Sequence, residues 1–231
     1  MVTACHRASH MAALLLYGGS RPFYRASAAL VLSPYRNMKE LLFATHNANK
    51  AKEIARMLDG DWQILTLDDA GVTVDIPETA DTIEGNALIK ARFLHSLTGK
   101  ACFADDTGLE VNALDGRPGV MTARFAGEEC DPERNMAKLL GELDGVDDRG
   151  AAFRTVIAYI AADGRETLFG GVCRGSIASA KHGSQGFGYD PVFEPQGFGG
   201  ASFAEMSLDD KNKISHRGQA VRGLVNFLKS K

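Results

Sequence analysis

The sequence predicts an α/β protein whose core is a mixed β-sheet flanked by helices. The chain has 231 residues, of which 45% are hydrophobic and 24% charged, enough apolar material for a well-formed core. From Met38 onward, short apolar runs typical of buried strands alternate with longer stretches that carry apolar residues at helical spacing. Because no repeat or linker interrupts this alternation, we expect residues 38–231 to form one domain.

The first elements form a strand–helix–strand unit. Residues 41–45 are a short apolar run typical of a buried strand. Residues 48–58 place Ile54 and Leu58 on one helical face, and residues 62–67 are the next predicted strand.

The middle of the chain continues with a helix and two short strands. Apolar side chains at helical spacing predict a helix over residues 83–97. Residues 101–104 and 109–113 are predicted as separate strands, with Asp105, Asp106 and a turn between them.

The last elements have clear boundary signals. Asp131 before Pro132 predicts the start of a helix that runs to about residue 143. Predicted strands at 152–162 and 166–177 flank an Asp-Gly turn, and Ser215 caps a final helix that reaches residue 228. Strand–helix–strand units combined with a hairpin imply a sheet with both parallel and antiparallel pairs.

Residues 1–37 differ in composition from the rest of the chain. They contain four arginines but no lysine, aspartate or glutamate. This composition is that of a transit peptide, yet the segment lacks an amphipathic repeat. We therefore expect residues 1–37 to be a disordered or non-native N-terminal extension rather than a targeting segment.

Charge and cysteine usage exclude several classes of protein. The net charge of −3 argues against a broad cationic surface for duplex nucleic acid. No apolar run approaches the roughly 18 to 20 residues needed to span a bilayer. The four cysteines are widely spaced with no C-x-x-C pair, which favours a reducing compartment, so we expect a cytoplasmic protein.

The run Thr45-His46-Asn47-Ala48-Asn49-Lys50 lies between a predicted strand and a predicted helix. The N–H groups of a first helical turn and the helix dipole favour an anion, and the polar side chains add donors. We interpret the run as a phosphate-binding site; the alternative is an asparagine-rich turn with a solvated lysine.

Adjacent acids, Asp105 and Asp106, follow the apolar run at 101–104. Magnesium takes one or two carboxylates and completes its shell with water and phosphate oxygens. Successive strand residues point to opposite faces, so we expect one acid to face the ligand and the other to brace the chain. Glu78, in a polar loop, is a candidate for a further metal oxygen; a solvated acidic turn is the alternative interpretation.

Two further clusters lie near the C-terminus. Residues 186–191 combine glycines with Phe187 and Tyr189, which suits contact with a planar base, although a glycine turn with buried aromatics has the same pattern. Lys211, His216 and Arg217 place positive charge near a helix start, where the dipole disfavours it. A bound anion would remove that conflict; a solvated basic turn is the alternative.

Together, in this order and spacing, the clusters resemble the inosine triphosphate pyrophosphatase family, which acts on non-canonical purine nucleoside triphosphates. The resemblance covers essentially all of residues 38–231 and rests on T-H-N-A-N-K, A-D-D-T-G-L, F-G-Y-D-P and I-S-H-R-G-Q-A. It implies hydrolysis of ITP, dITP and XTP to the monophosphate and pyrophosphate with Mg²⁺. It also implies a long mixed sheet, two lobes around a central substrate cleft, and a homodimer.

The resemblance also implies roles for individual residues. Asp106 matches the proton acceptor, and Glu78 and Asp106 match the magnesium ligands. The residues that match substrate contacts are Thr45, His46, Asn47, Ala48, Asn49, Lys50, Lys90, Thr107, Phe187, Gly188, Tyr189, Asp190, Lys211, His216 and Arg217. Arg124 lies in another stretch that is similar to the family, without an assigned role.

Two positions depart from the family pattern, which commonly has glycine at His46 and serine at Thr107. Threonine keeps the hydroxyl, whereas the imidazole of His46 either points outward or narrows the phosphate entrance.

Two other functions compete with this interpretation. An aspartyl-phosphate phosphatase would need two acids separated by one residue, whereas Asp105 and Asp106 are adjacent. A nucleotide-binding sensor would hold a triphosphate without cleaving it and would not need Asp106.

Overall fold

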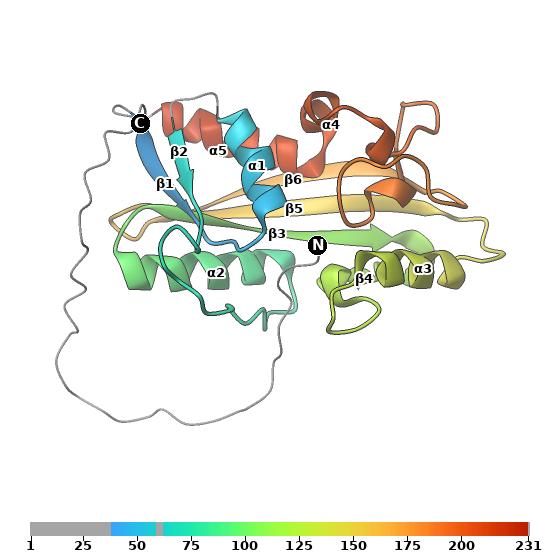
Figure 1. The fold of residues 1–231 in the computed structure, drawn as a ribbon, viewed down its shortest axis with the longest axis horizontal. Coiled ribbons are helices and arrows are strands. Elements are labelled where there is room, and N and C mark those ends of the chain that lie inside the picture. The colour runs from blue at the N-terminus through green and yellow to red at the C-terminus, as the bar shows by residue number, and fades with distance from the viewer. Residues whose placement is uncertain (1–37, 59–61, 231) are drawn as a thin grey trace, which may run out of the picture.

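The computed structural model describes residues 38–58 and 62–230 (Figure 1). The extension expected at residues 1–37 lies outside the described residues.

Seven strands of the described residues form one sheet, and its mixed character is as the sequence predicts. The strand order is β2-β1-β3-β5-β6-β7, with β4 paired to β3. The β1–β2 and β1–β3 pairs are parallel and the remaining pairs are antiparallel. The strands are β1 (Lys39–Phe43), β2 (Trp62–Leu65), β3 (Cys102–Val111), β4 (Pro118–Gly119), β5 (Gly150–Ile160), β6 (Glu166–Ile177) and β7 (Phe193–Pro195).

Helices cover both faces of this sheet. Figure 1 shows α1, α4 and α5 on one face and α2 and α3 on the other. The helices are α1 (Ala48–Met57), α2 (Ile83–Thr98), α3 (Pro132–Glu142), α4 (Leu208–Ile214) and α5 (His216–Lys229). Short 3-10 turns lie at Asn112–Leu114, Thr122–Arg124, Asp190–Val192 and Phe203–Glu205. No helix among the described residues is long and apolar enough to cross a membrane.

The predicted N-caps at Asp131 and Ser215 are confirmed. The Asp131 side chain accepts from the N–H groups of Glu133 and Arg134, and the Ser215 side chain accepts from that of Gly218. The short helix α4, which is separated from α5 by the single residue Ser215, was not predicted from the sequence.

The prediction of two strands around an acidic turn is wrong. Residues Cys102–Val111 form one continuous strand, β3, in which every residue pairs with β5. Long-range pairing with a central strand outweighs the local turn preference of Thr107-Gly108. Asp105 and Asp106 therefore lie within a strand and not at its end.

Side chains of β3 alternate between the two helical layers. Cys102 and Ala104 pack in the cluster beneath α2, whereas Phe103 packs in the cluster beneath α1 and α5. Because side chains in a strand alternate with period two, Asp105 faces α1 and α5 and Asp106 faces α2.

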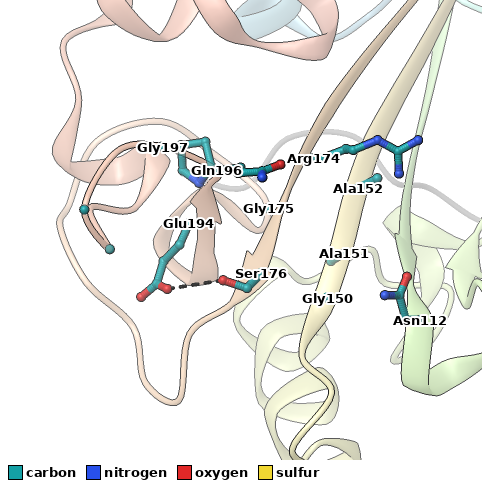
Figure 2. A pocket seen from close by; sticks show the side chains of 13 residues that line it. Asn112, Gly150, Ala151, Ala152, Arg174, Gly175, Ser176, Glu194, Gln196 and Gly197 are labelled. Carbon is teal, nitrogen blue, oxygen red and sulfur yellow. Dashed lines mark hydrogen bonds between the residues drawn. The ribbon is translucent and has the colours of Figure 1, made fainter.

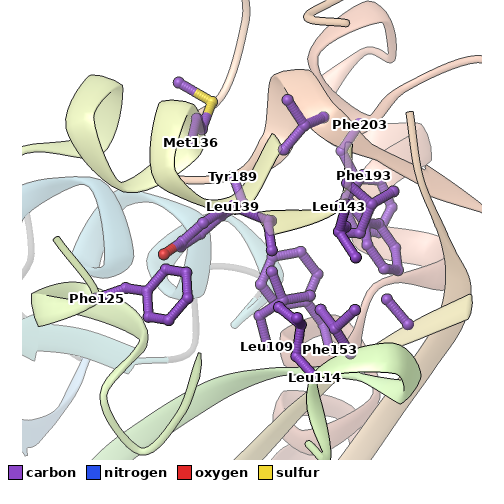
Figure 3. Close-up of a cluster of buried hydrophobic side chains, with 14 of the residues drawn as sticks. Leu109, Leu114, Phe125, Met136, Leu139, Leu143, Phe153, Tyr189, Phe193 and Phe203 are labelled. Carbon is purple, nitrogen blue, oxygen red and sulfur yellow. The ribbon is translucent and has the colours of Figure 1, made fainter. Parts of the chain in front are cut away.

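A third apolar cluster lies between the sheet and α3 (Figure 3). It joins Leu109 and Phe153 of the sheet to Leu139 of α3 and to the aromatic rings of Phe193 and Phe203. Phe153 and Phe193 lie 4.7 Å apart between ring centroids. This cluster fixes the segments after β6, which carry residues 187–190 to the sheet.

Among the described strands, none pairs with one edge of β3 over the acidic pair. The parallel strand β1 pairs with β3 at Cys102 and Phe103, whereas β4 pairs with it at Leu109 and Glu110. Residues 104–108 therefore lie between the ends of two short neighbours on this side of β3.

Candidate active site

The loop between β1 and α1 is organised around Asn47, the N-cap of α1. Its side-chain oxygen accepts from the N–H groups of Asn49 and Lys50, at 3.0 and 3.2 Å. Within the described residues, the N–H groups of His46 and Ala48 donate to no protein acceptor. Two backbone donors at the positive end of α1 are thus available to an anion.

Lys50 turns from this loop toward β3. Its Nζ donates to Oδ1 of Asp105 at 2.9 Å, and Oδ2 of the same carboxylate accepts from Nε of Arg217 at 3.2 Å. Asp105 is 1% exposed, and burial would raise its pKa, but Lys50 and Arg217 hold that pKa well below its ordinary value. Asp105 is therefore an ionised brace between two cations.

Asp106 faces the other helical layer and shares a lysine with Glu78. Nζ of Lys90 donates to Oδ1 of Asp106 and to Oε1 of Glu78, each at 2.8 Å. Arg124 donates to the second oxygen of Glu78 at 3.4 Å. The structure thus brings Lys90 and Arg124 together with Glu78 and Asp106, the two predicted metal ligands.

The pKa values of the two carboxyl groups beside Lys90 are shifted in opposite directions. Burial, with a smaller effect from Glu78, raises the pKa of Asp106 above its ordinary value despite Lys90. Burial would also raise the pKa of Glu78, but Lys90 and Lys50 outweigh it and lower that pKa. Burial opposes the charged form of Lys90, yet Asp106 and Glu78 raise its pKa. A carboxyl group with a raised pKa is suited to accept a proton.

The residues present fit a magnesium ion. One oxygen each from Glu78 and Asp106 converges on the same ammonium group, so both carboxylates reach a common position. Oxygen donors are the ligands that Mg²⁺ prefers, and it keeps waters besides one or two carboxylates. No group of three His, Cys, Asp or Glu side chains suited to a metal occurs in the part of the chain that the structure describes.

A second ionic network joins α1 to α4 and α5. Glu53 of α1 accepts from Lys211 at 3.1 Å and from Arg217 at 2.6 Å. Lys211 also donates to Asp190 at 2.7 Å. A continuous chain of buried ion pairs therefore runs from Lys50 through Asp105, Arg217, Glu53 and Lys211 to Asp190.

This network explains how positively charged side chains are accommodated near the start of the final helix, where the helix dipole disfavours them. Lys211 lies in the last turn of α4, where the dipole favours it, and not at the start of the final helix as expected. Arg217 does lie in the first turn of α5, and the carboxylates of Glu53 and Asp105 supply the compensating negative charge.

The segment at residues 187–190 is folded around Asp190. The N–H of Phe187 donates to Oδ2 of Asp190 at 2.8 Å, and a Cβ at Gly186 would overlap that carboxylate. The half-buried ring of Phe187 lies 5.0 Å from Nζ of Lys211 and 5.5 Å from the guanidinium carbon of Arg217. Phe187 is thus a flat ring held beside two cations.

Tyr189 is placed differently from Phe187. Its ring packs in the third apolar cluster, and its hydroxyl donates to the carbonyl of Thr122 at 3.0 Å. The Tyr189 side chain therefore stabilises the fold of this segment, which leaves Phe187 as its aromatic group beside the charged network.

His216 and Thr107 complete the arrangement. The His216 ring stacks on Phe153 with centroids 4.5 Å apart, and its Nδ1 is buried without a hydrogen-bond partner. Burial and the charges of Arg217 and Lys211 hold the pKa of His216 well below its ordinary value. The Thr107 hydroxyl lies 2.6 Å from that of Thr155.

Two surface depressions are lined by other residues. The larger, about 490 Å³, is lined by segments of β5, β6 and β7 and contains Arg174, Ser176 and Glu194 (Figure 2). The other, about 450 Å³, is lined by Glu84, Arg154 and β6. Neither contains a predicted site residue, so the paired charges around β3 define the candidate site.

Sequence reasoning missed Glu53 and assigned Arg124 no role. Glu53 follows Lys50 by three residues, so both lie on one side of α1, and this spacing was the available signal. Nothing in the sequence shows that Arg124 reaches Glu78, because β4 and the turn at Thr122–Arg124 bring them together.

The fold and the site define an α/β protein with paired carboxylates and cations on both faces of one central strand. The model of the Ham1 family matches residues 41–227, and the chain belongs to this family. A solved structure titled "The structure of the Staphylococcus aureus Ham1 protein" superposes with a TM-score of 0.76 and 36% identity, over 83% of this chain and 99% of that one.

Curated relatives carry a more specific name. A dITP/XTP pyrophosphatase of Flavobacterium psychrophilum is 50% identical over 191 residues, which is 83% of this chain and 100% of the relative. A dITP/XTP pyrophosphatase of Porphyromonas gingivalis is 54% identical over 192 residues, covering 83% and 98%. The family predicted from the sequence motifs is confirmed.

Proposed function

We propose that this protein hydrolyses ITP, dITP and XTP to the nucleoside monophosphate and pyrophosphate, and so removes non-canonical purines from the nucleotide pool. The observation that carries the proposal is the placement of Asp106, whose pKa is raised, beside Glu78 and Lys90. The names of the curated relatives support the same activity.

The triphosphate is bound by the loop at residues 45–50 and by lysine side chains. Free backbone N–H groups at the start of α1 are suited to bind an anion, and Lys50 adds a positive charge from the same loop. In the free protein Lys50 is held by Asp105 and Lys90 by Asp106, so these cations are already ordered before the nucleotide arrives.

In this proposal Glu78 and Asp106 would hold the magnesium ion. When bound, the ion would supply positive charge that neutralises phosphate oxygens and makes the attacked phosphorus more electrophilic. Asp106 accepts a proton from the attacking water as its oxygen bonds to the α-phosphorus. The bond from the α-phosphorus to the bridging oxygen breaks, and pyrophosphate leaves with the electron pair, stabilised by Lys50 and the helix N–H groups.

The base and sugar lie toward Phe187, His216 and Arg217, in a cleft between two lobes along the open edge of β3. Inosine and xanthosine carry an acceptor at position 6, where adenosine carries a donor. Buried donors that meet this acceptor would reject adenine by a factor of about 10⁴, because the wrong base leaves them unpaired.

A panel of purine triphosphates tests the proposal. With Mg²⁺, we expect ITP, dITP and XTP to yield pyrophosphate and monophosphate, whereas ATP yields little of either. Release of orthophosphate alone would indicate a different phosphohydrolase. Binding of ITP without release of any product would instead favour a nucleotide sensor.

We also propose that the protein is a homodimer that acts in the cytoplasm. Both statements rest on the family resemblance. Sedimentation of the purified chain at micromolar concentration separates a dimer from a monomer, and cell fractionation tests the location.

A further inference from the structure

The geometry points to His46 as a positioning residue that fastens the phosphate-binding loop to the segment carrying Glu78. This role rests on the proposed function of both loops. His46 is the second residue of the phosphate-binding loop, directly after Thr45.

The side chain of His46 joins two segments that are distant in sequence. Its Nδ1 lies 2.7 Å from Oδ1 of Asp68, and its Nε2 lies 3.4 Å from the carbonyl oxygen of Val74. One backbone hydrogen bond runs alongside, from the N–H of Leu67 to the carbonyl of Thr45 at 3.2 Å. The loop after β1 is thus tied at three points to the segment after β2.

Both ring nitrogens of His46 face groups that can only accept hydrogen bonds. A carboxylate oxygen and a carbonyl oxygen carry no proton, so a neutral imidazole can satisfy only one of them. The carboxylate of Asp68, at 2.7 Å, is the nearer of the two acceptors.

The segment that His46 holds has little regular structure of its own. Between the end of β2 and the start of α2, residues 66–82 contain only turns and irregular chain. Glu78 lies four residues beyond Val74, so a fixed point at Val74 limits the positions open to Glu78. His46 thereby sets the distance between the phosphate-binding loop and a metal ligand.

These contacts also fix the direction in which the imidazole ring points. The side chain is 22% exposed and both of its nitrogens are engaged with the chain after β2. The ring is therefore held against the chain after β2, and the N–H of His46, which donates to no acceptor among the described residues, remains available to an anion.

Kinetics of four variants test this role. We expect His46→Ala to raise KM for ITP and for Mg²⁺ by about threefold to fivefold, the range of an exposed ion pair, with a smaller change in kcat. Asp68→Asn should give part of this effect, and the double variant should be no worse than His46→Ala, because both remove one contact. His46→Gln keeps one donor and should recover part of the loss.

Hydrogen exchange provides a readout that requires no turnover. In the nucleotide-free protein, amides of residues 66–76 should exchange about threefold to fivefold faster in His46→Ala than in the parent. Asp163→Asn is a matched control, because it also breaks an exposed ion pair, with Arg165 in the β5–β6 turn. It should leave both KM and this exchange unchanged.

The outcomes separate this inference from the proposed function. An inactive parent would refute the function, yet faster exchange in His46→Ala would still support the fastening role. An active parent whose KM and exchange do not respond to His46→Ala would overturn the role and leave the function intact. Additive effects of His46→Ala and Asp68→Asn would show that the two residues act independently.

Discussion

Asp105 and Asp106 are adjacent residues with opposite environments. Asp105 meets Lys50 and Arg217 on one face of β3, and its pKa is held well below the ordinary value. Asp106 meets Lys90 on the other face, near Glu78, and its pKa is raised. One carboxylate therefore stays ionised as a brace, while the other is suited to exchange a proton.

Asp106→Asn should abolish turnover and preserve the fold. Asparagine cannot accept the proton of water, so we expect kcat for ITP to fall by about 10²- to 10⁴-fold. Pyrophosphate release measures the loss, and an unchanged melting temperature excludes unfolding. Asp210→Asn, at an exposed acid paired with Lys213, is the control and should retain full activity. Parent-like turnover of Asp106→Asn would remove this residue from the mechanism.

His216 should make stability depend on pH below about 6.5. Burial, Arg217 and Lys211 lower its pKa in the folded state, so the unfolded chain binds a proton that the folded protein does not. Unfolding free energy should therefore fall as the pH drops from about 6.5 toward the lowered pKa, by up to about 1.4 kcal/mol per pH unit.

Denaturant titrations at several pH values measure this slope. His216→Phe keeps an aromatic ring on Phe153 but cannot titrate. Its unfolding free energy should therefore depend less steeply on pH, by the contribution of one bound proton. Equal slopes for the two proteins would show that His216 is protonated in the folded state as well.

At the scale of elements, β3 and β6 position the two halves of the site. β3 carries the acids, whereas β6 approaches α5 closely enough to fix the helix start with His216 and Arg217. A Cβ at Gly171 of β6 would overlap the carbonyl oxygen of His216, whereas no heavy atom lies within 4 Å of a Cβ at Gly170. The absence of a side chain at Gly171 therefore sets the distance between sheet and helix.

Gly171→Ala should destabilise the protein and disturb the site. The added methyl group must displace the first turn of α5, and overpacking of this kind costs about 1 to 3 kcal/mol. Thermal unfolding and KM for ITP measure the two effects. Gly170→Ala, one residue away on the opposite face, is the matched control and should change neither. Equal behaviour of the two variants would mean that α5 can move freely.

Element prediction from sequence succeeded where local signals were strong. Asp131 and Ser215 cap helices as expected, and the Asp163-Gly164 turn joins β5 and β6, with Gly164 at a positive φ of 86°. It failed for β3, because the pairing of Thr107 and Gly108 with β5 is invisible in a local window. The short polar helix α4 has too few residues to show a period.

The candidate site was predictable as a set of residues but not as a set of pairs. The motifs indicated Lys50, Asp106 and Arg217, yet the sequence does not show that Lys50 contacts Asp105 while Lys90 contacts Asp106. These pairings depend on which face of the sheet each helix covers, and that is a property of the tertiary structure.

At the scale of the whole molecule, three apolar clusters support one continuous sheet. Two lie on opposite faces of its β1–β3–β5 part, and the third joins β3, β5 and β7 to α3. The cluster members that the structure describes all lie after Met38. The described residues thus contain the packing that stabilises the site.

A chain that starts at Met38 should be as active and as stable as the full chain. The expectation follows because the described members of the clusters and the described ion pairs of the site lie beyond this residue. Circular dichroism melting and ITP hydrolysis of the two chains measure the difference. A lower melting temperature or lost turnover in the shorter chain would assign residues 1–37 a role in the fold.

The strand that separates Asp105 from Asp106 also constrains how this protein can change over time. Inserting or deleting one residue between Phe103 and Asp105 would rotate every following side chain to the opposite layer and present each acid to the wrong lysine. Individual residues of β3 can be exchanged for others of similar shape. A variant whose β3 is one residue longer or shorter would lose both the Lys50–Asp105 pair and the Lys90–Asp106 pair.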